Sequence, residues 1–262
     1  MYTNLNLEQD LFKGTSKYYS QYRFPYIKET INDILRIVNA GPNETLLDLA
    51  CGPGRLSIPL SKYFKEVYAV DWEKEMIDEG ERISNELCIE NIKWICGKAE
   101  ELTVKPNSIK LITIGDAFHR MDQLKILQDS HKMLEKGGYL ALIYSGTIDN
   151  GESEWQKELR KVISPWKKVN IQSNNNLKQP WDLFLQETDY INVTFREFEE
   201  VISVNLETII GYLYSMSVYT KNIIGEKYQL FENEIREKLL KIEPKDNFDF
   251  NFKCGYYIGE KE

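Results

Sequence analysis

The chain has 262 residues, which is enough for one large domain or for a core domain with an insertion. At 42% apolar and 28% charged residues it is not disordered, collagenous or coiled-coil. The 41 acidic and 33 basic side chains give a net charge of −8, which argues against a protein that clamps nucleic acid phosphates.

Cysteines stand at 51, 88, 96 and 254 without a CxxC pair, and the chain has two histidines. This spacing predicts neither a metal site nor a disulfide framework, and free cysteines fit a reducing compartment. The N-terminus lacks the apolar run of a signal peptide, and no stretch of about 18 apolar residues occurs. We therefore expect a cytoplasmic protein without a membrane span.

The chain alternates between helical and strand patterns up to about residue 150. Isoleucines recur about once per helical turn over 27–39, which predicts a helix. A later helix begins with Asp122 as its N-cap and is stopped by Gly137 and Gly138. Short apolar runs predict strands at 45–50, 66–71, 92–96, 110–115 and 139–144, with further helices at 55–63 and 73–87. This alternation indicates a parallel sheet covered on both faces.

The rhythm changes after residue 150. Residues 151–163 predict a helix, 164–190 are irregular, 193–206 alternate like an antiparallel strand, 207–220 and 226–242 are helical, and 249–262 form a final strand. We expect four segments: an N-terminal helical cap (1–40), a core (41–150), an insertion or lid (151–192), and C-terminal strands with helices that form part of a cover (193–262).

The strongest motif is LLDLACGPG at 46–54, a hydrophobic strand that runs into a glycine turn. Such a turn lets the backbone pass close to a ligand, and the following helix presents free N–H groups. Tight packing of strand on helix is the alternative explanation. Asp71 ends the next strand, 19 residues after Gly52, where a carboxylate can accept both hydroxyls of a ribose.

Two further strand ends carry polar or glycine residues. Gly97 is followed by Lys98, Ala99 and Glu100, whose backbone can meet an adenine ring, and Asp116 ends the fourth strand. Because ligands of open α/β sheets bind at the carboxyl edge, these residues predict a nucleoside cofactor there.

Two nucleoside cofactors compete for this edge. A dinucleotide site needs a third glycine where Ser57 stands. Asp48, inside the strand, would repel a pyrophosphate and suits a ligand with an ammonium and a sulfonium group. The residues therefore favour S-adenosylmethionine (SAM) over a nicotinamide dinucleotide.

The motifs DLACGPG, Val70-Asp71, GKAE and LEKGGYLAL occur in the order and spacing of class I SAM-dependent methyltransferases, which residues 20–145 resemble. Within them the chain is similar to the type 11 small-molecule group. The run AFHRMD at 117–122 and the run IIGYLYSMS at 209–217 resemble the trans-aconitate methyltransferase branch, although Arg120 replaces its usual Trp. The resemblance implies a Rossmann-like, doubly wound α/β sheet of seven strands, mostly parallel with an antiparallel final strand, plus a mainly helical substrate cover.

The resemblance also implies roles for individual residues toward the cofactor. The backbone of Ala50 and Gly52 lines the methionine moiety, and Asp48 lies near its amino group. At the nucleoside end, Asp71 takes the ribose hydroxyls. Trp72 lies against the adenine, and Lys98, Ala99 and Glu100 lie at the adenine edge. The Asp116 carbonyl accepts from the ammonium. Tyr19 and Arg23 belong to an N-terminal cap, in which Arg23 meets the carboxylate.

On the acceptor side we expect Tyr18, His119, Tyr144 and Trp181. His119 directly follows the fourth strand and is the candidate general base, with a structural histidine as the alternative. Tyr144 is either a pocket or a rim residue, and Trp181 belongs either to a lid or to packing. Cys51 and His131 are expected to be packing residues.

The resulting hypothesis is a SAM-dependent methyltransferase that acts on an oxygen or nitrogen atom, a carboxylate included, of a small-molecule acceptor. We expect no nucleic acid or membrane partner, and the oligomeric state is open. The alternatives are an RNA or protein methyltransferase and a non-catalytic SAM-binding module; a nicotinamide oxidoreductase is disfavoured by Ser57 and Asp48.

Overall fold

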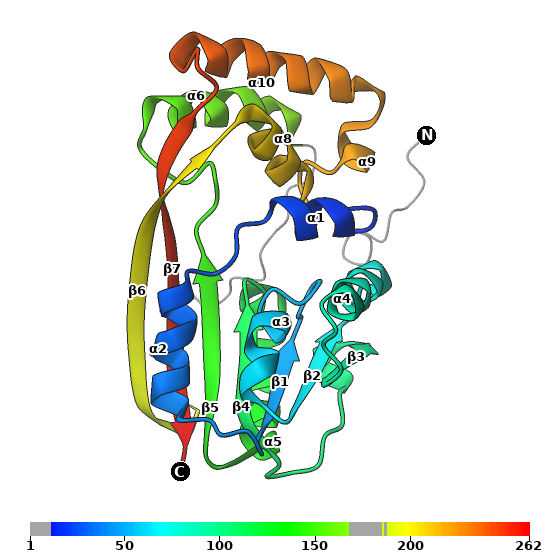
Figure 1. Ribbon diagram of the computed structural model, residues 1–262, viewed down its shortest axis with the longest axis vertical. Helices are drawn as coiled ribbons and strands as arrows, with labels where there is room; N and C mark the ends of the chain where they lie inside the picture. The colour runs from blue at the N-terminus through cyan, green and yellow to red at the C-terminus, as the bar shows by residue number, and fades with distance from the viewer. Residues whose placement is uncertain (1–11, 168–184, 186–187) are drawn as a thin grey trace. The chain divides into compact units, whose positions relative to one another are not determined.

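The computed structural model describes residues 12–167, 185 and 188–262 (Figure 1). The chain divides into two compact units, which are described separately below. The sheet unit comprises 25–145, 172–198 and 253–262, and the helical unit comprises 1–24, 146–171 and 199–252.

The sheet has seven strands in the order β3-β2-β1-β4-β5-β7-β6. The first five strands along the chain pair in parallel, and β7 is antiparallel to β5. The predicted fold class is therefore confirmed. The strands are β1 (Thr45–Leu49), β2 (Glu66–Asp71), β3 (Ile92–Cys96), β4 (Ile109–Gly115), β5 (Leu134–Ser145), β6 (Tyr190–Val204) and β7 (Phe248–Lys261).

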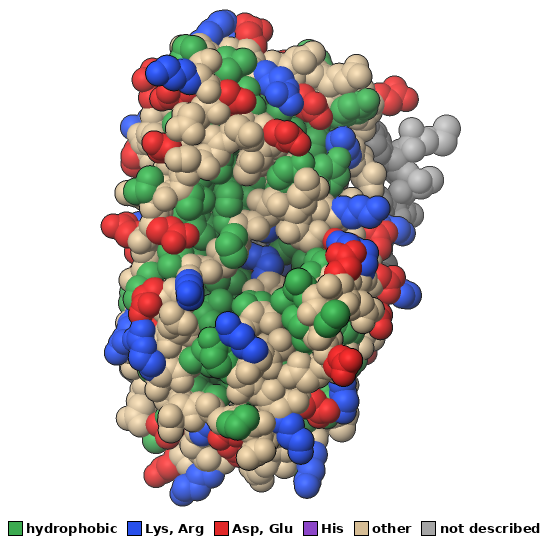
Figure 2. All heavy atoms as spheres, in the orientation of Figure 1, with side chains coloured by type: hydrophobic (Ala, Val, Ile, Leu, Met, Phe, Trp, Pro, Cys, Tyr) green, Lys and Arg blue, Asp and Glu red, His purple; other side chains and the backbone are tan. Residues whose placement is uncertain are grey.

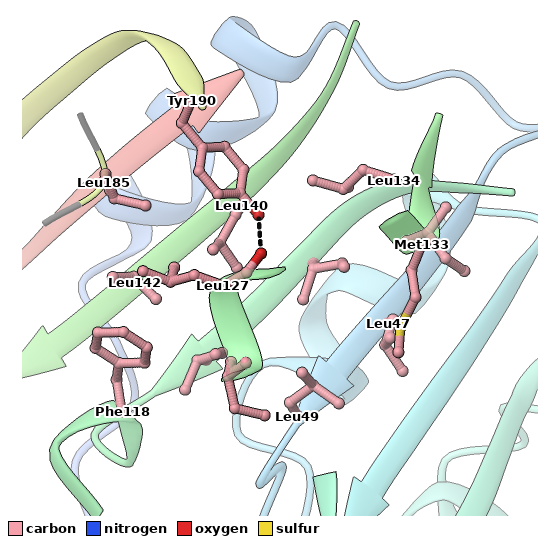
Figure 3. Close-up of a cluster of buried hydrophobic side chains, with 14 of the residues drawn as sticks. Leu47, Leu49, Phe118, Leu127, Met133, Leu134, Leu140, Leu142, Leu185 and Tyr190 are labelled. Atoms are coloured by element: carbon pink, nitrogen blue, oxygen red, sulfur yellow. Dashed lines mark hydrogen bonds between the residues drawn. The ribbon is translucent and has the colours of Figure 1, made fainter. Parts of the chain in front are cut away.

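Central strands are buried on both faces, because helices cover them. Four of the five residues of β1 are buried, and β4 has a continuous run of four buried residues. Figure 3 shows leucines of β1 and β5 packed against Leu127 and Met133 of α5. The helices of this unit are α2 (Lys28–Val38), α3 (Ser57–Leu60), η1 (Ser61–Tyr63), α4 (Lys74–Glu86), η2 (Ala99–Glu101), η3 (Phe118–Arg120) and α5 (Gln123–Met133).

The end of α5 differs from the prediction. Asp122 is its N-cap, as expected, and accepts a hydrogen bond from the backbone N–H of Lys125. The helix ends at Met133, however, and Gly137 and Gly138 lie inside β5, next to a register shift in its pairing with β4. A Cβ at Gly138 would lie 3.0 Å from the Ile109 carbonyl oxygen, so this glycine permits close strand approach rather than stopping a helix.

The helical unit is built around aromatic side chains. The ring of Phe24 lies 5.1 Å from that of Tyr212, and the Trp155 ring lies 5.4 Å from that of Phe248. These distances are typical of favourable aromatic pairs. The helices are α1 (Ser16–Tyr22), α6 (Glu154–Ile163), η4 (Ser164–Trp166), α8 (Leu206–Tyr214), α9 (Lys221–Ile224), η5 (Gly225–Lys227) and α10 (Tyr228–Ile242).

Helix α1 packs against α8, beside which it lies in Figure 1. The ring of Tyr22 occupies the space beside Gly211, where a Cβ would overlap it. The division into units therefore separates α1 from α2, whereas the sequence grouped both in one cap at 1–40. Within the described parts of the chain, no helix is both long and apolar enough to cross a bilayer.

Candidate cofactor site

The glycine turn after β1 has left-handed backbone at three residues. Ala50, Gly52 and Gly54 have φ angles of 54°, 56° and 89°. A Cβ at Gly54 would lie 2.6 Å from Trp94 Cη2, so packing alone accounts for this glycine. Gly52 differs, because its N–H donates to the Asp71 carboxylate at 2.8 Å and joins the turn to the end of β2.

Asp71 is held by two backbone donors. Its Oδ2 accepts from Gly52 and its Oδ1 from the Glu73 N–H at 2.9 Å, and the residue is only 7% exposed. Burial raises the pKa of Asp71, and the backbone hydrogen bonds partly offset this. Each carboxylate oxygen has a second lone pair. A fixed acceptor of this kind, at the carboxyl edge of β2, suits a pair of sugar hydroxyls.

Asp48 has partners inside the protein. The residue is 1% exposed in the interior of β1. Its Oδ2 accepts from the N–H and hydroxyl of Ser57, and its Oδ1 from Thr113 Oγ1 at 2.8 Å. Burial raises the pKa of Asp48 to about 6, against the effect of these hydrogen bonds, and the Asp71 charge adds to the rise. Asp48 thus joins β1, β4 and the start of α3, and its contact with the cofactor amino group stays a prediction.

Asp116, directly after β4, is the centre of a polar network that sequence reasoning missed. Its Oδ2 accepts from the Tyr26 hydroxyl at 3.0 Å, Arg55 Nη1 at 3.0 Å and Ser145 Oγ at 2.7 Å, and its Oδ1 accepts from the Ser145 N–H at 2.7 Å. A Cβ at Gly115 would overlap the Tyr26 hydroxyl. The only sequence signal for this network was Arg55, next to the glycine turn.

The network holds Asp116 at φ 54°, a left-handed conformation uncommon for a residue other than glycine. Four donors occupy the carboxylate, so the side chain fixes the backbone at the end of β4. The predicted role of the Asp116 carbonyl as an ammonium acceptor is consistent with this geometry and is untested.

The predicted adenine residues lie at the neighbouring strand ends. Trp72 follows β2 and is 42% exposed, so its ring is accessible for stacking. Lys98 pairs with Glu101 at 3.7 Å, and Ala99 begins η2. Glu100 accepts from the Asp122 N–H at 3.3 Å, which joins η2 to the start of α5.

His119 lies in η3, half-buried, after the end of β4. Its Nε2 accepts from Arg120 Nε at 3.2 Å. Burial lowers the pKa of His119 and the Arg120 charge lowers it further, while Asp116 acts in the opposite direction. Both of the larger effects favour the neutral imidazole, whose acceptor nitrogen is occupied by Arg120 in this structure.

Tyr144 reaches across the sheet. Its hydroxyl donates to Glu197 of β6, and its ring is parallel to that of Phe195 with centroids 6.5 Å apart. Lys253 of β7 holds the other Glu197 oxygen at 2.9 Å. Burial raises the pKa of Tyr144, and Glu197 adds to the rise. Tyr144 therefore has a clear packing role, and its contact with an acceptor stays a prediction.

Of the remaining predicted residues, three lie in the helical unit and one lies outside the described residues. Tyr18, Tyr19 and Arg23 belong to the helical unit, where the Tyr18 ring lies 5.4 Å from that of Tyr214. Trp181 lies outside the described residues. The sheet unit by itself thus brings together Asp48, the glycine turn, Asp71 and Asp116.

His131 and Cys51, which the sequence predicts to be packing residues, are both in contact with other parts of the protein interior. The His131 ring lies edge-on to Tyr190 with centroids 5.4 Å apart. Cys51 is buried, and burial raises the pKa of its thiol, so it lacks the thiolate character of a nucleophile.

On the face shown in Figure 2, acidic and basic side chains are interspersed with apolar ones.

Comparison with known proteins agrees with this geometry. Residues 46–138 match the family model described as a methyltransferase domain. This stretch includes the glycine turn, Asp71 and Asp116. The chain thus contains a class I SAM-dependent methyltransferase domain, as its motifs predicted, with SAM as cofactor. The narrower likeness to the trans-aconitate branch stays a prediction.

Relatives and solved structures of low identity extend the similarity. A candidate methyltransferase of Dictyostelium discoideum is 23% identical over 97% of this chain and 95% of its own length. A demethylmenaquinone methyltransferase of Oceanobacillus iheyensis is 28% identical over 42% of this chain and 48% of its own length. The chain spans about half the length of several other curated relatives that it matches.

Among solved structures, a candidate type II methyltransferase of Anaeromyxobacter dehalogenans has a TM-score of 0.65. It is 16% identical, and the match covers 92% of this chain and 98% of that one. At this identity the likeness concerns the fold.

Proposed function

We propose that the whole protein is an enzyme that transfers the methyl group of SAM to an oxygen or nitrogen atom of a small-molecule acceptor. The observation that carries the proposal is the buried Asp71 carboxylate, fixed by the glycine turn at the edge where a nucleoside binds. The relative from Oceanobacillus iheyensis, whose name specifies demethylmenaquinone, supports an acceptor that is not a nucleic acid or a protein.

The residues of the sheet unit fit the cofactor. The left-handed turn at 50–54 brings backbone close to the ligand, Asp71 accepts the ribose hydroxyls, and Trp72 stacks on the adenine. The sulfonium supplies an activated methyl group. The protein contributes alignment of acceptor and methyl carbon, exclusion of water, and, for a hydroxyl or ammonium acceptor, removal of a proton.

His119 is the proposed base for that proton. Burial and the Arg120 charge lower its pKa, which favours the neutral form, and it stands three residues after Asp116, whose network fixes the end of β4. A carboxylate acceptor would need no base, so the role of His119 depends on the acceptor. Tyr144 and Tyr18 are proposed acceptor contacts.

Two measurements test the proposal. Calorimetry with S-adenosylhomocysteine (SAH) should show binding in the micromolar range, and incubation of the enzyme with cell extract and isotope-labelled SAM should label a small molecule. Absence of SAH binding would refute the cofactor assignment. Tight SAH binding without any labelled product would favour a non-catalytic module, and label in RNA or protein would favour the macromolecular alternative.

A further inference from the structure

The turn that precedes α6 is held in place by two side chains of that helix. Gln156, which is 2% exposed, donates from Nε2 to the Ile148 carbonyl at 2.9 Å. Arg160 donates from Nη1 to the carbonyls of Asp149 and Gly151. A Cβ at Gly151 would overlap the Gln156 amide, so the turn packs closely against the helix. The backbone of Asp149 is therefore fixed, while its side chain takes no part in these bonds.

The Asp149 carboxylate lacks the partners that the other buried aspartates have. Its Oδ1 is buried and has no hydrogen-bond partner in the described part of the chain, and no cation of that part forms an ion pair with it. By contrast, Asp33, Asp48 and Asp71 of the sheet unit each accept at least two hydrogen bonds. Desolvating a carboxylate oxygen without a compensating partner is unfavourable. A positively charged ligand would supply the partner.

Tyr219 of the same unit lies within range of the Asp149 charge. Its ring is 5% exposed and stacks on that of Phe231, with centroids 6.2 Å apart. Burial raises the pKa of the Tyr219 hydroxyl to about 12, and the Asp149 charge adds to the rise. The two side chains are not hydrogen-bonded to each other among the described contacts, so the phenol oxygen keeps its acceptor lone pairs. An aromatic ring also attracts organic cations through its π face.

These groups suit an ammonium better than a metal ion. Ca²⁺ takes about six to eight oxygen ligands, whereas the carbonyls of this turn already accept from Gln156 and Arg160. Within the described residues, no group of three or more His, Cys, Asp or Glu side chains is placed to hold a metal ion. A primary ammonium is a compact charge with three N–H donors, which a carboxylate oxygen and a phenol oxygen can share.

We propose that the Asp149 carboxylate, beside Tyr219, is the anchor of a site that binds the ammonium group of a small organic molecule. All of the residues that form it belong to the helical unit, and the site is independent of the proposed function. A potassium ion has the same charge as an ammonium group, so the test must separate the two.

The test titrates ethylammonium chloride at pH 7 into the full chain, labelled with ¹³C-tyrosine, and follows the Tyr219 ring signal by NMR. That signal is assigned from its absence in Tyr219→Phe. The control signal is that of Tyr214, whose hydroxyl already donates to the Glu232 carboxylate at 2.9 Å. The control ligands are potassium chloride at equal ionic strength and uncharged ethanol at equal concentration.

We expect ethylammonium to shift the Tyr219 signal saturably in the millimolar range and to leave the Tyr214 signal in place, while neither control ligand moves either signal. A shift of equal size with potassium chloride would assign the site to an inorganic cation and overturn the proposal. A Tyr219 signal that ethylammonium does not move, or that moves in parallel with Tyr214 or equally with ethanol, would also overturn it.

Asp149→Asn tests the anchor, because it removes the charge and keeps the shape of the side chain. This variant should raise the Kd for ethylammonium at least tenfold, while its midpoint of urea unfolding should not fall, since the buried Oδ1 has no partner to lose. Glu232→Gln, which changes a carboxylate that has a tyrosine partner, should bind ethylammonium as wild type does. Unchanged affinity in Asp149→Asn, or an equal loss in both variants, would contradict the proposal. Should Asp149→Asn not fold, the comparison of the three ligands on wild type decides alone.

Discussion

The two units stabilise their buried charged side chains with different kinds of partners. In the sheet unit, Asp48, Asp71 and Asp116 each accept two or more hydrogen bonds from neighbouring strands and turns. In the helical unit, Arg23 has neutral hydroxyl partners and aromatic faces instead of a carboxylate. The sheet edge is thus organised by hydrogen bonds to carboxylates, while the Arg23 guanidinium is held by hydroxyl oxygens and aromatic rings. The difference shows that one unit fixes its charged groups by hydrogen bonds between strands and turns, and the other by packing against aromatic rings.

The largest effect is expected at Asp71. Asp71→Asn removes the charge that accepts the ribose hydroxyls, and two hydrogen bonds to a charged acceptor are worth roughly 1.5–3 kcal/mol each. SAH affinity should therefore fall about 100-fold or more by calorimetry. Asp78→Asn, which alters an exposed ion pair with Lys74, is the matched control and should bind normally. Unchanged affinity in Asp71→Asn would show that the ordered sheet edge is not the cofactor site.

The Asp116 network should dominate the stability of the sheet edge. Asp116→Asn leaves Arg55, whose side chain is 11% exposed, without its carboxylate, and breaking a buried pair costs about 3 kcal/mol. Urea unfolding should show this loss. Glu29→Gln, which breaks the exposed pair with Arg36, should cost less than about 1 kcal/mol. If both variants lose a similar amount of unfolding free energy, the Asp116 network contributes no more to stability than an exposed ion pair does.

Asp48 makes the sheet unit sensitive to pH in a defined direction. Because its pKa in the folded protein is about 6 and its ordinary value is 3.8, the folded state binds the extra proton between these values. The stability of wild type relative to Asp48→Asn should therefore fall as pH rises from 4 to 7, on the order of 2–3 kcal/mol.

Urea unfolding at pH 4 and 7 measures this difference in stability. Asp129→Asn is the control with the opposite sign, because Lys125 and Lys132 lower the pKa of Asp129. Wild type should gain stability relative to that variant as pH rises. If the stability difference between wild type and Asp48→Asn does not change with pH, burial does not raise the pKa of Asp48 as predicted.

The smallest effect is expected at Trp72. Removing a stacking ring costs about 1–3 kcal/mol per base, so Trp72→Ala should weaken SAH binding roughly tenfold. Tyr63→Ala removes another ring of comparable exposure, at the end of η1, and should have no effect on calorimetric affinity. If both variants bind equally well, Trp72 does not contact the adenine.

The structural features that depend on residues adjacent in the sequence agree with the prediction. The turn after β1 and the acidic end of β2 depend on backbone conformation and on strand ends, which local sequence patterns report. The end of α5 was predicted wrongly, because Gly137 and Gly138 resemble a helix stop, and only the pairing of β4 with β5 shows them inside a strand.

The sequence by itself determined the class of the fold and the positions of Asp71 and Asp116 at strand ends, because hydrophobic periodicity and glycine turns are local properties. The resemblance of its motifs to a known family predicted the SAM-dependent methyltransferase domain. The tertiary structure decided which donors each charged group meets. Tyr26, Arg55 and Ser145 converge on Asp116 from three segments, and Ser215 and Tyr212 reach Arg23 from the far end of the chain. Such partners are distant in sequence, and only the packing of helices and strands brings their polar atoms within hydrogen-bonding distance.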